Sequence, residues 1–133
     1  MEPHLVVFLE KVIDIENAFH LDYQLLGHFP IENSSNLNAY FGFGETGAPY
    51  DPAAVCGSPF DTSARIARLF NESSRWFRTS KLYIAELETL EAIQKRMTSH
   101  GSSNDQLDHI IGIIREIDKN PEHRGRITFW LEY

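Results

Sequence analysis

Residues 60–100 read FDTSARIARLFNESSRWFRTSKLYIAELETLEAIQKRMTSH. This stretch contains neither glycine nor proline, although Pro59 stands just before it and Gly101 just after it. Because these two residue types are the strongest local breaks in regular structure, their absence favours helix. Apolar or small side chains recur in it every three or four residues, which is the spacing of one helical face. The members of this face are Ile66, Phe70, Ser73 and Phe77, and then Tyr83, Leu87, Leu90, Ile93 and Met97.

The same pattern leaves open whether the stretch forms one helix or two. A break near Thr79-Ser80 would give two helices, and Ser80 would then cap the second one. We expect Asp61 or Thr62 to cap the first helix, because each offers a side-chain oxygen to the free backbone N–H groups.

A third helix and a final strand are predicted after this stretch. Gly101 suits the end of the preceding helix, and Asn104 suits the N-cap of the next one. Apolar residues then keep helical spacing as far as Pro121, which stops the helix. From residue 126 to residue 133 alternate positions are apolar, which predicts a strand. The helical stripe consists of Leu107, Ile110, Ile111, Ile114 and Ile117.

The N-terminal region predicts three strands. Residues 4–15 fit a helix or a strand, and we favour a strand because the next segment, residues 19–25, alternates clearly. Residues 16–18 would form the turn between the two. A second alternating run, residues 37–43, predicts the third strand, although it contains a glycine.

Together these elements predict an α+β fold in a single domain, residues 1–133. Three N-terminal strands and the C-terminal strand would form a mostly antiparallel sheet. Two or three helices between Asp61 and Lys119 would cover one face of it. The composition, with 42% hydrophobic and 23% charged residues, is ordinary for a globular protein with its own core.

Cysteine content and the N-terminal sequence favour a cytoplasmic protein. Cys56 is the single cysteine, so no internal disulfide can form, and a reducing compartment fits best. The apolar run from Leu5 to Leu9 is too short for a signal peptide or a membrane span. We therefore expect no membrane as a partner.

Charge is distributed unevenly along the chain. The formal net charge is −7, and residues 1–60 account for all of it, with eight acidic residues and one basic residue. Residues 61–133 carry eleven of each sign. A negative surface repels phosphate, which argues against nucleic acid, and it attracts a basic protein. The alternative is a solvated acidic face that only keeps the protein soluble.

The segment from residue 44 to residue 60 predicts a long irregular loop, since it holds three of the six prolines and three of the eight glycines. Loops of this length in compact domains are often functional. Aromatic and acidic residues in and around it suit contact with a protein partner. The candidate partner-binding residues are Glu32, Tyr40, Phe43, Glu45, Tyr50 and Asp51.

A metal site is the alternative reading of the N-terminal region. His20 and Asp22 are two residues apart on a predicted strand, so both side chains would point to the same face. An iron site of the type with two histidines and one carboxylate begins with such a pair. No third ligand is marked by its spacing, and a surface His–Asp contact explains the pair as well.

Two other motifs do not predict chemistry. Residues 42–47 match G-x-G-x-x-G, but Pro49 and Pro52 follow directly, so no helix opens there to bind a dinucleotide. Cys56 has no assignable histidine partner, and we expect an unreactive thiol. We therefore expect no cofactor.

Basic residues give the first long helix one positive side. We expect these residues to pair with N-terminal carboxylates inside the fold rather than to bind nucleic acid. They are Arg65, Arg68, Arg75, Arg78 and Lys81.

The sequence thus predicts a small acidic cytoplasmic binding protein rather than an enzyme. An inhibitor of the immunity-protein or antitoxin type, which neutralises a basic toxin or nuclease, fits this pattern. The alternative is a small metal-dependent enzyme that uses His20 and Asp22. A self-associating subunit is a third possibility, because the sequence leaves the oligomeric state open.

Overall fold

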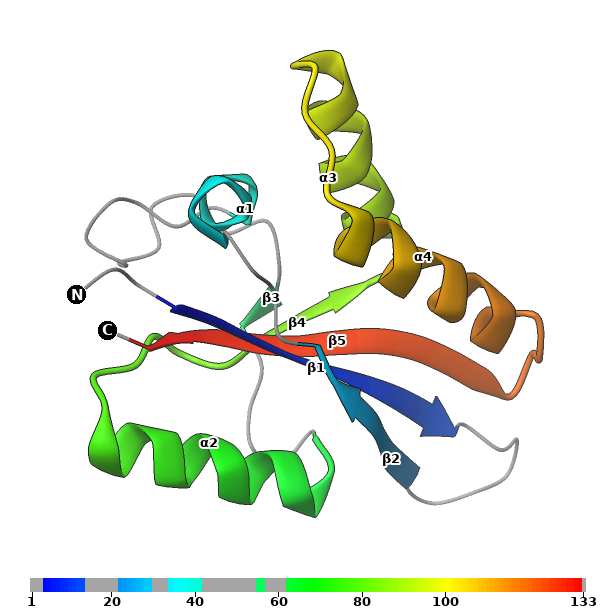
Figure 1. Cartoon of the computed structure of the whole chain (residues 1–133). Helices are drawn as coiled ribbons and strands as arrows, with labels where there is room; N and C mark the ends of the chain where they lie inside the picture. The colour runs from blue at the N-terminus through cyan, green and yellow to red at the C-terminus, as the bar shows by residue number, and fades with distance from the viewer. Residues whose placement is uncertain (1–3, 14–21, 30–33, 42–54, 57–61, 133) are drawn as a thin grey trace.

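The computed structural model describes residues 4–13, 22–29, 34–41, 55–56 and 62–132 (Figure 1). The fold is α+β, as predicted, with an antiparallel sheet. The strands lie in the order β2-β1-β5-β4-β3, and each neighbouring pair is antiparallel. The strands are β1 (His4–Ile13), β2 (Asp22–His28), β3 (Val55–Cys56), β4 (Tyr83–Glu86) and β5 (His123–Glu132), and the helices are α1 (Ser34–Tyr40), α2 (Ala64–Trp76), α3 (Leu87–Ser99) and α4 (Asp105–Asp118).

The centre of the sheet is the pair of β1 with β5. The two strands run in register from His4 opposite Glu132 to Ile13 opposite His123. Five consecutive residues of β1, from Leu5 to Leu9, are buried, so both faces of this strand are covered. Burial on both faces explains why the sequence of residues 4–15 also fitted a helix. The predicted strand is confirmed.

Helices cover both faces of the sheet. Alternate residues of β1 and β5, such as Val7 and Phe129, pack beneath α1, α3 and α4. The residues between them, such as Phe8 and Trp130, pack against Ile66 and its neighbours on α2. The expectation that the helices lie on one face is therefore not confirmed, because α2 lies on the opposite face (Figure 1). Each fully buried large apolar side chain contributes about 1.5–3 kcal/mol to folding.

The described part of this stretch, residues 62–100, forms two helices with a strand between them. Strand β4 pairs with β5 and buries Tyr83 and Ala85, so long-range pairing overrides the helical spacing. Ser80 does not cap α3. Instead its hydroxyl accepts a hydrogen bond of 2.9 Å from the N–H of Leu131. The cap of α2 is Ser63, next to the predicted Thr62, and its hydroxyl accepts from the N–H of Ile66 at 3.3 Å.

Residues 34–40 form helix α1, so the strand predicted over residues 37–43 is wrong. Leu37 and Phe41 are four residues apart and both are 1% exposed. This spacing fits a helix as well as a strand, and contact of Phe41 with Phe129 selects the helix, with 4.7 Å between the ring centroids. Residues 42 and 43 lie outside the described part of the chain.

The C-terminal elements confirm the sequence analysis. The side chain of Asn104 accepts a hydrogen bond of 2.9 Å from the N–H of Leu107 and caps α4. Gly101, with φ of 73°, follows the end of α3, where a left-handed residue is needed. Helix α4 then crosses β5 at Gly125, where an added Cβ would lie 3.0 Å from the side chain of Ile114.

Candidate functional site

Of the predicted partner-binding residues, Tyr40 lies within the described part of the chain. Glu32, Phe43, Glu45, Tyr50 and Asp51 lie outside it.

The predicted metal pair is only half described, because His20 also lies outside the described residues. Asp22 is the exposed first residue of β2 and stands opposite Ile13 of β1. Within the described ranges, no three His, Cys, Asp or Glu side chains gather in a way that suits a metal ion.

Tyr40 is held in place by the C-terminal half of α3. Its hydroxyl shares a hydrogen bond of 2.9 Å with Nδ1 of His100. The guanidinium of Arg96 donates from Nη2 to the Tyr40 carbonyl oxygen at 2.6 Å. The guanidinium carbon of Arg96 also lies 5.4 Å from the centre of the Tyr40 ring, which is within cation–π range. This half-buried aromatic side chain is therefore ordered before any partner arrives.

Glu10 is buried and adds no charge to the surface, although it is one of the eight acidic residues among residues 1–60. Its side chain is fully buried, and Oε1 accepts from Nε and Nη2 of Arg126 at 3.2 and 3.1 Å. The other oxygen, Oε2, accepts from the N–H of Ser63 at 2.7 Å. Arg126 in turn lies over the ring of Tyr23, with 4.9 Å from Cζ to the ring centre. Glu10 therefore joins β1, β5 and the start of α2, and its role is structural.

The outer side of α2 presents basic residues to solvent. Arg65, Arg68 and Arg75 are exposed, and none of them forms an ion pair with another described residue. The expectation that the basic residues of this helix pair inside the fold is therefore not confirmed for these three. The N-terminal carboxylate Glu10 pairs instead with Arg126, which comes from β5.

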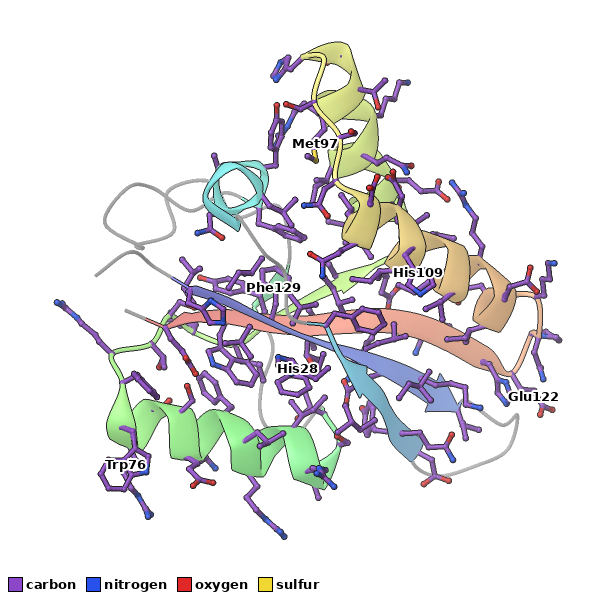
Figure 2. The ribbon with its side chains drawn as sticks, viewed as in Figure 1. His28, Trp76, Met97, His109, Glu122 and Phe129 are labelled. Atoms are coloured by element: carbon purple, nitrogen blue, oxygen red, sulfur yellow. The ribbon has the colours of Figure 1, made fainter. Side chains whose placement is uncertain are left out.

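Two aromatic residues stand beside these arginines at the end of α2. Trp76 is 72% exposed and Phe77 is 49% exposed. Figure 2 shows Trp76 pointing away from the sheet. The sequence analysis placed Phe77 on the buried stripe, but α2 ends at Trp76, and the chain then turns toward β4. The sequence signal for this exposure is the arginine on either side of the aromatic pair, Arg75 and Arg78, since core residues are rarely flanked by charge.

The opposite side of the molecule is acidic. Residues 86–124, which include α3 and α4, hold eight acidic and five basic residues. Between the two helices lies a groove, to which the buried side chains of Met97 and Leu107 contribute apolar atoms. Gln94 and Asp108 meet across it, with 2.7 Å between Nε2 and Oδ1. Lys95 also lines the groove.

No family model matches the chain, and no curated protein or solved structure is significantly similar to it. No helix in the described ranges is both long enough and apolar enough to cross a membrane. The candidate functions therefore rest on charge, exposure and the position of aromatic side chains.

Proposed function

We propose that this chain is a small acidic binding protein that captures a basic protein partner in the cytoplasm. The observation that carries the proposal is the charge of residues 1–60. These residues hold eight acidic residues and one basic residue. Only Glu10 among the acidic residues is taken up by a buried ion pair with Arg126, as far as the described residues extend. The excess of acidic residues in this region supports a basic partner.

The binding mechanism combines an electrostatic field with aromatic anchors. Glu32, Glu45 and Asp51 would steer the partner during its approach and fix its orientation. Tyr40, Phe43 and Tyr50 would supply the apolar contacts that dominate binding energy. Tyr40 supports this role because Arg96 and His100 already hold it, so little side-chain entropy is lost on binding.

An inhibitor of the immunity-protein or antitoxin type fits these features. Such a protein needs no catalytic group of its own, because it acts by covering the basic surface of a toxin or nuclease. The single cysteine, Cys56, agrees with a reducing compartment. The negative field disfavours nucleic acid and anionic membranes as partners.

Affinity capture from the native lysate tests this function. The immobilised protein should retain one basic protein at low salt and release it in a salt gradient. The variant Glu45→Lys/Asp51→Lys should lose this capture, because it replaces two attractive charges with two repulsive ones.

The matched control is Glu88→Lys/Glu116→Lys. It changes the net charge by the same amount on exposed residues of α3 and α4, so it should retain the partner. Equal loss of capture in both variants would mean that only net charge matters, and this would overturn the assignment of the site.

A further inference from the structure

The two helical layers carry opposite charge. The segment from residue 62 to residue 81 includes α2 and holds five basic residues and one acidic residue, all exposed. We call its outward side, formed by these charged residues with Trp76 and Phe77, the α2 surface. The α3–α4 surface is formed by the charged residues from 86 to 124, eight acidic and five basic, and includes Arg124 because it pairs with Glu86. The two surfaces therefore have opposite formal charge, five minus one on the α2 surface and five minus eight on the α3–α4 surface.

These two surfaces cannot meet within one molecule. Helix α2 packs against the face of the sheet that carries Phe8 and Trp130. Helices α3 and α4 pack against the other face, which carries Val7 and Phe129 (Figure 1). The sheet therefore lies between the basic surface and the acidic one, and only a second molecule can bring them together.

The α2 surface also has the apolar centre that a protein contact requires. Trp76 and Phe77 are 72% and 49% exposed and adjoin exposed Arg75 and Arg78. Tryptophan and arginine are the residue types most enriched at binding hot spots. Exposed apolar side chains that stand side by side and are bordered by polar residues are typical of an interaction site.

The α3–α4 surface has a feature that receives such a side chain. The groove between the helices has the buried side chains of Met97 and Leu107 among its lining residues and is bordered by Asp108. An indole ring that enters this groove places a neighbouring arginine near the carboxylates in the first turn of α4, Asp105 and Asp108.

We infer that this protein self-associates head to tail, with the α2 surface of one copy on the α3–α4 surface of the next. The contact joins two different surfaces, so the dimer keeps one free surface of each kind, and assembly can continue beyond a dimer. We infer that the α2 surface binds a second copy of this chain, because every copy carries the acidic α3–α4 surface. Within one molecule the sheet keeps that surface away from α2.

Sedimentation velocity of the full chain tests the inference at two salt concentrations. At about 0.1 M salt, where the Debye length is about 10 Å, contacts between the surfaces persist while repulsion between distant acidic residues is screened. At about 1 M salt the Debye length is about 3 Å, so the contacts between the two surfaces should weaken. We expect a sedimentation coefficient that rises with protein concentration at the lower salt and a monomer at the higher salt.

Two variants, each folded by circular dichroism, then identify the surfaces. Arg65→Gln/Arg68→Gln/Arg75→Gln removes three of the five basic residues of the α2 surface, and Glu88→Gln/Asp105→Asn/Glu116→Gln removes three of the eight acidic residues of the α3–α4 surface. Each variant alone should be monomeric. Their mixture should form a dimer and nothing larger, because each supplies the intact surface that the other lacks.

Trp76→Ser, which leaves every charge in place, should also weaken association. Glu45→Lys/Asp51→Lys, which should lose capture of the basic partner, should self-associate like the wild type. The two proposals can therefore fail independently of each other. A wild-type monomer at about 0.1 M salt, a triple variant that still associates, or a monomeric mixture would each overturn the inference. A monomeric protein whose α2 arginines bind phosphatidylserine vesicles or RNA would also overturn the inference.

Discussion

Glu10 of β1 and Arg126 of β5 stand opposite each other in the sheet and form a buried ion pair, with 3.1 Å between Oε1 and Nη2. The Arg126 side chain is 8% exposed and that of Glu10 is not exposed at all. Glu10 also accepts a hydrogen bond from the N–H of Ser63, and Ser63 is the N-cap residue of α2. The pair therefore ties the central strands to the helix that carries the basic surface.

Removing one member of this pair should strongly destabilise the fold. We expect Glu10→Ala to lower the free energy of unfolding by about 3–5 kcal/mol, because it removes the carboxylate that faces the buried Arg126 charge. The double variant Glu10→Ala/Arg126→Ala should cost much less than the sum of the two single variants. Urea unfolding measures all three.

The surface pair of Glu86 with Arg124 is the matched control. Its atoms are 3.6 Å apart, and the side chains are 50% and 47% exposed. Glu86→Ala should cost less than about 1 kcal/mol. Equal costs for Glu10→Ala and Glu86→Ala would contradict a structural role for Glu10.

Ser73 should be required for the packing of Trp130 beneath the sheet. The indole N–H of Trp130 donates to the Ser73 hydroxyl at 3.1 Å, and this hydroxyl donates to Oε1 of Glu132. Ser73→Ala leaves a buried N–H without its acceptor, so we expect a loss of about 1–3 kcal/mol in unfolding free energy.

Ser74→Ala is the control, because Ser74 is exposed on the same helix. It should change the free energy of unfolding by less than about 0.5 kcal/mol. A neutral Ser73→Ala variant would show that the Trp130 N–H finds another acceptor.

Two glycines should respond in opposite ways to alanine. An added Cβ at Gly125 would lie 3.0 Å from the Ile114 side chain and 3.1 Å from its Cα, so Gly125→Ala should cost about 1–3 kcal/mol. At Gly112 on α4 no atom lies within 4 Å of the added Cβ. Gly112→Ala should therefore stabilise the protein by about 0.5–1 kcal/mol. Thermal unfolding of both variants checks this, and a stabilised Gly125→Ala variant would contradict the close crossing of α4 over β5.

The sequence predicted correctly those elements for which the capping residue and the apolar spacing indicate the same structure. Helix α4 has a cap at Asn104 and an apolar stripe on one side, and both were visible in the sequence. The final strand was visible from its alternation. Helix α1 was missed because Leu37 and Phe41 satisfy both the strand and the helix spacing, and only contact with Phe129 decides between them.

Long-range contacts account for the remaining differences. Residues of strand β4 have helical spacing in the sequence. Their partners in β5 are at least forty residues away, so a local pattern does not reveal the pairing. Glu10 counted as a surface acid in the sequence because its partner, Arg126, is 116 residues away. Phe77 counted as core because the sequence did not show that α2 ends at Trp76. The charge separation between the helical layers appears only once the sheet is known to lie between them.

The most direct test of the proposed function is calorimetric titration of the captured partner with the wild-type protein and with Glu45→Lys/Asp51→Lys. We expect tight binding by the wild type that weakens steeply as salt rises, and a large loss of affinity in the variant. Tyr40→Ala should weaken binding at every salt concentration, because it removes an ordered aromatic anchor. Wild-type affinity in both variants, or affinity that does not depend on salt, would contradict capture of a basic partner by the acidic N-terminal region.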